Sequence, residues 1–353
     1  MNCGWIAAAT MAAFCFAGAA RAHAYDCISP GGGILEPTTT TEPTAPTPGS
    51  ITLAMLPDVQ YYTKCRLPHL TAQLRWLSGE MPRRDMRAAL YMGDLTEHNT
   101  REEWRWFRDQ LEPFQDKLPI LLATGNHDYG HDGDAHLRQT LFDNYFRAPP
   151  GAAAPLLATD LRNSIENAYY RIALPRVTLG VLVLEWAPRA STVAWANRVL
   201  SQFAHDRVIV VTHAYLYEDS TRYDWHTRGA AQRWNPLWYD MDWLEQLYDR
   251  EYDGEMLWNA LVRRHPGIFL VLCGHVGGSG TGQLASRGDG GNLVEQVLAN
   301  FQLLDQGGLG YLRLFEIQPD GRSMRMKTYS PSLGQFAIAS AQQAVLPIEP
   351  ALW

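Results

Sequence analysis

The sequence predicts an α/β fold with a mostly parallel β-sheet. Beyond residue 50, short apolar runs of strand length alternate with longer segments whose apolar residues recur with helical period. The last four apolar runs, from Ile268 onward, are not separated by clear helical segments, so we expect antiparallel strands there. The chain has 353 residues, 46% of them hydrophobic, which is enough to bury one large core.

The expected strands are Ile51–Leu56, Ala88–Met92, Ile120–Ala123, Tyr169–Leu174, Thr178–Leu184, Val208–Thr212, Ile268–Cys273, Val294–Ala299, Tyr311–Ile317 and Met324–Tyr329. The clearest helix begins at Thr100, because Thr100 and Glu103 can form a capping box. Apolar residues then repeat on one helical face at Trp104, Phe107, Leu111 and Phe114. Further helices are expected at His69–Glu80, Ala135–Tyr145, Val193–Phe203 and Glu255–Arg264.

Residues 1–24 are predicted to be a signal peptide. The run Trp5–Ala20 is almost entirely apolar, and two Ala-x-Ala sites follow it, at residues 20–22 and 22–24. No Lys or Arg precedes the run, so an uncleaved anchor is the alternative, although the run is shorter than the roughly twenty residues of a membrane span. We therefore expect a secreted or periplasmic protein with no stable membrane span after cleavage.

The rest of the chain divides into three parts. Residues 25–50 are rich in Thr, Pro and Gly and are predicted to be a linker, residues 51–332 form one catalytic domain, and residues 333–353 form a C-terminal tail. Among the cysteines outside the signal peptide, Cys27 and Cys65 are the expected disulfide pair, because Cys273 lies in an apolar run that we expect to be buried.

Polar clusters follow five of the predicted strands, at the strand ends where α/β sheets bind ligands. They are Asp58-Val59-Gln60, Gly93-Asp94, Gly125-Asn126-His127-Asp128, Thr212-His213 and Gly274-His275. Each cluster alone is ordinary, since an Asp after a strand is usually a helix cap and a lone His usually a packing residue. Together they supply carboxylates, an amide oxygen and imidazoles, the mixed oxygen and nitrogen set that transition metals favour.

The order of these clusters resembles the calcineurin-like metallophosphoesterase superfamily, whose motifs run D-x-H, G-D, G-N-H-D/E, H and G-H-x-H. The third motif is intact at Gly125–Asp128. More narrowly, the chain resembles a secreted, poorly characterised branch with a D-x-Q first motif, in the segments Leu56–Tyr62, Thr212–Leu216 and Leu298–Gln302. The resemblance extends from about Ile51 to about Pro331 and implies a layered α/β sandwich of mixed β-sheets flanked by helices.

The resemblance also implies roles for single residues. Asp94 would bridge two divalent metals, Asp58 would bind the first, and the second would be completed by Asn126, His213 and His275. A metal-bound hydroxide would attack a phosphate monoester or diester in line, because a cation lowers the pKa of its water. His127 would face the leaving group as a general acid, and Asp128 would fix the tautomer of His127.

Two positions depart from the superfamily pattern, and both belong to the first metal. Gln60 replaces the His of D-x-H, and Gly277 replaces the last His of G-H-x-H. Besides carboxylates, only the weak amide oxygen of Gln60 remains for that metal. We therefore expect one or two ions per chain, from Mn, Fe, Zn or Mg, with one bound tightly and any second one loosely.

An aromatic-rich segment between His213 and Gly254 begins beside a predicted ligand. We expect it to form a wall or lid of the substrate cleft, with substrate-binding candidates Arg222, Tyr215 and His226. The alternative is an insertion packed on its own aromatic residues. The polar stretch His131–His136 is predicted to be a solvated turn rather than another metal site, because glycines interrupt it.

The leading interpretation is an enzyme that hydrolyses a small-molecule or lipid-linked phosphate ester. The alternative is a catalytically impaired protein that binds a phosphate ligand through a single tight metal site. A third interpretation keeps the metals but has a phosphonate or a cyclic nucleotide as substrate. The intact Asn126-His127-Asp128 motif favours catalysis, because binding alone needs no placed general acid. Nucleic acid is not an expected partner, since the formal net charge is −7 and no basic run appears.

Overall fold

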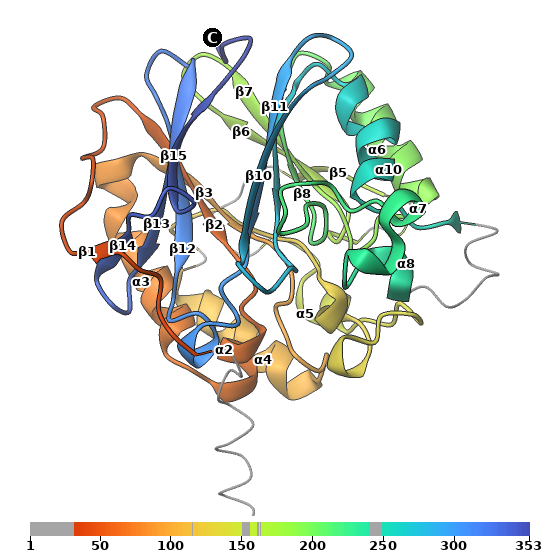
Figure 1. Cartoon of the computed structure of the whole chain (residues 1–353), viewed down its shortest axis with the longest axis horizontal. Helices are drawn as coiled ribbons and strands as arrows, with labels where there is room; N and C mark the ends of the chain where they lie inside the picture. The colour runs from red at the N-terminus through yellow and green to blue at the C-terminus, as the bar shows by residue number, and fades with distance from the viewer. Residues whose placement is uncertain (1–31, 115, 150–155, 161, 163, 240–248) are drawn as a thin grey trace, which may run out of the picture.

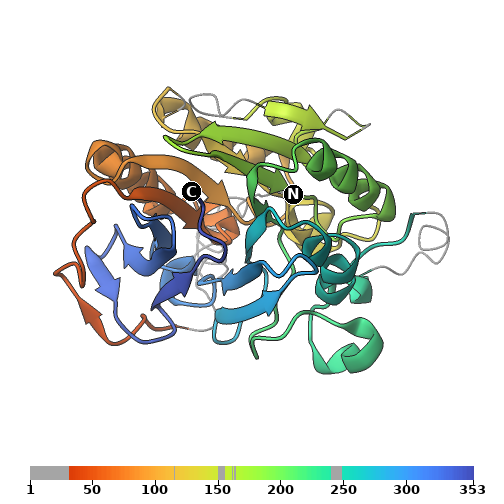
Figure 2. The same ribbon diagram turned by 90° about the horizontal axis from the view of Figure 1, so that it is seen from above.

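The computed structural model describes residues 32–114, 116–149, 156–160, 162, 164–239 and 249–353. Two mixed β-sheets lie against each other, and helices flank them (Figures 1 and 2). This confirms the predicted layered α/β sandwich. The predicted signal peptide, residues 1–24, and Cys27 lie outside the described residues, while Cys65 is disulfide-bonded and Cys273 is free and buried.

The first sheet has β2 (Ile51–Leu56), β3 (Met86–Tyr91) and β4 (Ile120–Leu122) as parallel neighbours. Antiparallel strands extend the sheet beyond β2 in the order β12 (Leu312–Ile317), β13 (Ser323–Ser330), β14 (Gln335–Ala337) and β1 (Thr38–Thr39). A further strand, β15 (Gln343–Pro347), also pairs with β13. Parts of the predicted linker and tail thus contribute β1, β14 and β15 to this sheet.

The second sheet has four parallel neighbours, in the order β7 (Thr178–Val183), β8 (Arg207–Val211), β9 (Ile268–Cys273) and β11 (Leu293–Ala299). Antiparallel strands complete its two edges: β10 (Thr281–Arg287) beside β11, then β6 (Ala168–Ala173) and β5 (Leu156–Thr159) beyond β7. The expectation of antiparallel strands after Ile268 was wrong for β9 and β11. The unpredicted strand β10 returns the chain between them, so the two run parallel.

The described helices are α2 (Gln60–Cys65), α3 (His69–Arg84), α4 (Arg101–Leu111), α5 (Phe142–Tyr145), α6 (Ala190–Gln202), α7 (Trp225–Arg228), α8 (Pro236–Tyr239) and α10 (Gly254–Ala260). The capping box at Thr100 is confirmed, because its hydroxyl accepts from Glu103 N and the Glu103 carboxylate accepts from Thr100 N. The helix predicted at Ala135–Tyr145 was wrong, since only α5 forms there. Arg138, at positive φ, turns its side chain to Glu251 and Glu185 instead.

Successive residues of the central strands bury their side chains on opposite faces of the second sheet. Ile209 and Val211 belong to the main core, which the two sheets share, whereas Val208 and Val210 pack in a second core with residues of α6 and α10. Both faces of β8 are therefore buried among apolar side chains, and its carboxyl end is the place where polar side chains can gather. Among the described residues, no helix has the length and apolar character to cross a membrane.

Residues 32–50 run along the first sheet and are held there by a carboxylate shared between two cations (Figure 1). Glu42 accepts from Arg84 Nη1 and Lys327 Nζ, each at 2.9 Å. The side chains of Arg84 and Lys327 are 2% and 5% exposed. Burial raises the pKa of Glu42, but the two cations outweigh burial and lower it overall.

The substitution Glu42→Gln should lower the free energy of unfolding by about 2 kcal/mol near neutral pH, because Arg84 and Lys327 lose their shared charge. The folded pKa of Glu42 lies below its unfolded value. The stabilisation is therefore complete above the unfolded pKa and disappears as pH falls through the folded pKa. Denaturant unfolding at neutral and acid pH measures this. The control Glu102→Gln removes only an exposed pair with Arg66, and an equal loss in both variants would contradict the prediction.

Candidate metal centre

Three predicted ligands converge where strands of both sheets end. Asp94 follows β3 of the first sheet, and His213 and His275 follow β8 and β9 of the second. Their ligand atoms all lie within 4.8 Å of one another. Asp94 Oδ2 is 3.3 Å from His213 Nε2, which is 3.2 Å from His275 Nδ1. All three residues are buried, with 1%, 0% and 6% of their surface exposed.

Backbone carbonyls fix the orientation of both imidazoles. His213 Nδ1 lies 2.7 Å from the Met92 carbonyl, and His275 Nε2 lies 2.7 Å from the Trp234 carbonyl. A carbonyl oxygen only accepts, so these two ring nitrogens carry hydrogens. Of the other two ring nitrogens, that of His213 faces Asp94 and that of His275 faces His213. Carbonyl bonding of the far nitrogen is how proteins orient metal-binding histidines.

The pKa values of Asp94 and His213 indicate that the cluster favours a positive charge. Burial lowers the pKa of His213, but Asp94 and Asp58 outweigh it and raise the pKa to about 9. Burial and the neighbouring His213 lower the pKa of His275 to about 3. Burial opposes the net lowering of the pKa of Asp94, which His213 and His127 cause. The cluster thus holds a proton among its lone pairs, and metal binding would displace it.

Asn126 supplies the fourth predicted ligand atom. It lies in η2 (Asn126–Asp128), and its Oδ1 is buried without a hydrogen-bond partner. The adjacent His127 N donates to Asp94 Oδ1 at 3.0 Å, so this loop lies against the cluster. The approach requires Gly125, where a side chain would meet Asp94 Oδ1 at 2.2 Å. A buried unpaired amide oxygen costs free energy unless a cation or a water meets it, which fits a ligand role.

The two first-metal residues, Asp58 and Gln60, contact the cluster through hydrogen bonds. Asp58 Oδ2 accepts from His275 N at 3.0 Å and from Asn300 Nδ2 at 2.7 Å. Gln60 Nε2 donates to Asp94 Oδ2 at 3.1 Å and also to Gln302 Oε1. Burial raises the pKa of Asp58 to about 7. Asn300 and Gln302, which follow β11, have no role predicted from the sequence.

His127 keeps an exposed edge beside the centre, but its orientation differs from the expectation. Its Nδ1 donates to the Glu97 carbonyl at 2.9 Å and lies 3.5 Å from the Glu97 carboxylate. Asp128 accepts instead from the backbone of Gly125, Leu95 and Thr96 and from the Thr96 hydroxyl. The predicted role of Asp128 in fixing the His127 tautomer was therefore wrong. A backbone carbonyl does this, and Asp128 ties the two ligand loops together.

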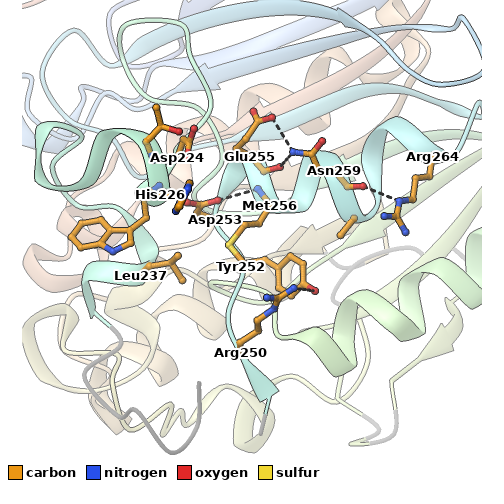
Figure 3. Close-up of a pocket in the computed structure, with 13 residues that line it drawn as sticks. Asp224, His226, Leu237, Arg250, Tyr252, Asp253, Glu255, Met256, Asn259 and Arg264 are labelled. Carbon is orange, nitrogen blue, oxygen red and sulfur yellow. Dashed lines mark hydrogen bonds between the residues drawn. The ribbon is translucent and has the colours of Figure 1, made fainter. Parts of the chain in front are cut away.

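The three substrate-binding candidates do not meet at the metal cluster. Arg222 donates to Glu255, Ser286 and Gln296, and it packs 4.4 Å from the ring of Trp258. Tyr215 is buried in the second core. His226 lines a separate cavity of about 520 Å³, which contains none of the predicted metal ligands (Figure 3). These positions indicate structural roles for Arg222 and Tyr215.

The aromatic segment reaches the centre through other residues. Trp234 supplies the carbonyl to His275, and the Tyr239 ring lies 6.3 Å from that of His275. Trp225 and Trp238 pack on each other, 5.7 Å apart, so part of the segment is also covered by its own aromatic residues. The segment thus contacts the cluster and in part packs on its own aromatic residues, while its role as a wall or lid of the substrate cleft stays a prediction. Residues 240–248 lie outside the described part of the chain.

An exposed second cluster lies in the predicted turn. Asp132 contacts His98 and His131 at 2.6 and 2.9 Å, and the two rings stack 4.8 Å apart. A side chain at Gly133, in the same turn, would meet His127 Nε2 at 2.9 Å. The turn is therefore solvated on one side, as predicted, and packs on the candidate general acid on the other.

Comparisons with known proteins give distant likenesses. No family model matches the chain. The uncharacterised protein YvnB of Bacillus subtilis (strain 168) is 26% identical over an alignment of 294 residues, which covers 79% of this chain and 20% of that protein. The chain thus spans about a fifth of the length of this relative.

Similar solved structures are also distant. GAP50, described as the anchor in the inner membrane complex of Plasmodium, is 12% identical, with 86% of this chain and 90% of that one covered and a TM-score of 0.45. A putative 5′-nucleotidase from Staphylococcus aureus is 14% identical, with 85% and 54% covered and a TM-score of 0.39. The calcineurin-like phosphoesterase YfkN from Bacillus subtilis is 12% identical, with 85% and 91% covered and a TM-score of 0.31. The case for a metal site rests on the geometry.

The substitution His213→Ala should weaken Mn²⁺ binding to the metal-free protein by at least ~100-fold, because it removes a buried ligand whose geometry is already fixed. Isothermal titration calorimetry measures this. His226→Ala is the matched control, since it removes an imidazole from the cavity of Figure 3 and should leave the affinity unchanged. Equal affinities in wild type and His213→Ala would show that Mn²⁺ binds elsewhere.

Proposed function

We propose that the chain hydrolyses phosphate monoesters or diesters with a divalent metal held by Asp94, Asn126, His213 and His275. The observation that carries this proposal is the convergence of buried lone pairs from Asp94, His213 and His275, with both rings already oriented by carbonyls. A divalent cation there would lower the pKa of a coordinated water and neutralise charge on a phosphoryl group. Mn, Fe, Zn and Mg all fit this mixed donor set.

His127 is the proposed general acid. The Glu97 carbonyl fixes Nδ1, so Nε2 is the ring atom left to meet a leaving oxygen, and it forms no hydrogen bond with another described residue. The main-chain nitrogen of His127 donates to Asp94, which places the ring beside the metal ligands. A proton delivered from Nε2 would make the departing alkoxide a neutral alcohol.

Lys64 is the proposed phosphate-attracting cation in place of Arg222. Its Nζ lies 3.7 Å from the Glu97 carboxylate, which in turn lies 3.5 Å from His127 Nδ1. Its side chain is 22% exposed, so a substrate can reach it. Arg222 has no such freedom, because Glu255, Ser286 and Gln296 use its guanidinium.

The proposed substrate is a small-molecule or lipid-linked phosphate ester met outside the cytoplasm. The apolar Trp5–Ala20 run supports export, and the formal charge of −7 disfavours nucleic acid. The second candidate function is binding of a phosphate ligand without turnover. It is favoured by one observation, the hydrogen bonds from Gln60 and Asn300 to the carboxylates that would hold a first metal.

The protein should hydrolyse nitrophenyl phosphate or bis-nitrophenyl phosphate when Mn²⁺, Fe²⁺, Zn²⁺ or Mg²⁺ is supplied. The substitution His127→Ala should lower kcat by roughly 10²- to 10⁴-fold on an alkyl phosphate, whose alkoxide leaving group needs the proton, and far less on the nitrophenyl esters. The control His136→Ala removes an exposed imidazole from the nearby turn and should leave kcat unchanged on both substrates. Release of inorganic phosphate from the alkyl ester and of nitrophenol from the aryl ester measures all three proteins. Tight phosphate binding without hydrolysis under any metal would favour the second function instead.

A further inference from the structure

We propose that the centre holds a single metal ion and that neutral amides take the place of a second one. The inference deepens the proposed function and rests on its metal site. The side chains of Gln60, Asn300 and Gln302 are here called the amide clamp. Gln60 and Asn300 donate to the two carboxylates that a second cation would need, Asp94 and Asp58, and Gln302 accepts from Gln60. The first-metal site of the superfamily pattern therefore does not fit this chain.

The bridging position on Asp94 is already used. One of its oxygens accepts from His127 N, and the other accepts from Gln60 Nε2 while it faces His213. An amide N–H carries partial positive charge, so its hydrogen bond meets part of the demand of the Asp94 carboxylate for positive charge. Gln302 Oε1 accepts from the same Gln60 nitrogen, which fixes the direction of the amide.

Gln60 Oε1 is buried without a hydrogen-bond partner, which makes it a competing candidate for a ligand atom. To bind a cation beside Asp94, the Gln60 amide would have to turn its oxygen toward Asp94. Both present hydrogen bonds of Nε2 would then break, and Oε1 would face the Gln302 oxygen, another acceptor. The orientation with Nε2 toward the two acceptors is therefore the favourable one.

The carboxylate of Asp58 also already accepts hydrogen bonds. It accepts from His275 N and from Asn300 Nδ2, with N···O distances of 3.0 and 2.7 Å. Only 2% of Asp58 is exposed, so each of these bonds would be costly to replace. The backbone bond to His275 also holds a ligand loop of the single site, which gives Asp58 a structural role there.

Gly277 contributes no imidazole, and the space around it is filled. A Cβ at this position would meet Leu303 Cδ1 at 2.6 Å. An apolar side chain thus lies where the side chain of a ligand at residue 277 would begin. The first-metal site keeps two carboxylates that already accept hydrogen bonds, and it lacks both imidazoles of the superfamily pattern. This donor set is too weak to hold a transition metal against competing water.

The test is the number of Mn²⁺ ions bound per chain. Every protein carries His131→Ala, because the exposed His98, His131 and Asp132 cluster could bind an extra ion. Metal-free protein is saturated with Mn²⁺, dialysed and analysed for metal, and its electron paramagnetic resonance spectrum is recorded. We expect about one ion per chain with the spectrum of an isolated Mn²⁺. About two ions per chain with an exchange-coupled spectrum would overturn the inference.

Restoring a ligand tests the clamp itself. Gln60→His places an imidazole beside Asp94 and should raise the stoichiometry from about one to about two Mn²⁺ per chain. The control Gln139→His adds an imidazole on the exposed surface and should leave it at about one. A folded Gln60→His protein that still binds one ion would show that Gln60 does not exclude the second. If Gln60→His fails to fold, the test is the ion count and the electron paramagnetic resonance spectrum of the protein that keeps Gln60.

The outcomes also separate this inference from the proposed function. Two ions with phosphoesterase activity would overturn the single-ion centre and leave the function intact. No bound ion at all, in a folded protein, would overturn both.

Discussion

The centre depends on two backbone carbonyls that hold the rings of His213 and His275. Because Met92 and Trp234 each accept a ring hydrogen, the other ring nitrogens and the carboxylate of Asp94 gather inside a region with almost no exposed surface. Such an arrangement is unfavourable unless a positive charge lies among the lone pairs. Folding thus builds a site whose stability improves when a cation enters, which is the thermodynamic basis of metal affinity.

These carbonyls come from distant parts of the chain, and this explains the arrangement of the surrounding elements. Met92 follows β3 of the first sheet, while Trp234 belongs to the aromatic segment. The geometry of the centre therefore depends on how both sheets and this segment are placed relative to one another. Arg222 contributes by tying the segment to Glu255 of α10 and to the second sheet at Gln296. Its guanidinium is engaged by these contacts within the fold.

The sequence predicted the central strands and the meeting of the ligands because both follow from local pattern. A buried parallel strand is a continuous apolar run, and its carboxyl end lies at one sheet edge, so Asp94, His213 and His275 could be placed from their positions alone. The short strands β1, β14 and β15 could not be predicted, since partners far along the chain stabilise them. The tautomer of His127 could not be predicted either, because the backbone carbonyl of Glu97 fixes it and every residue has such a carbonyl.

In a single-ion centre, protein side chains would contribute more to catalysis than they would beside two metal ions. An amide N–H from Gln60 withdraws far less charge from Asp94 than a second cation would, so Asp94 remains a strong donor to the remaining ion. A strongly bound donor makes that ion a weaker Lewis acid, and charge on the leaving oxygen is then neutralised less by metal. Proton delivery becomes more important in compensation. The firm attachment of His127, through its ring to Glu97 and through its backbone to Asp94, is what such a centre requires.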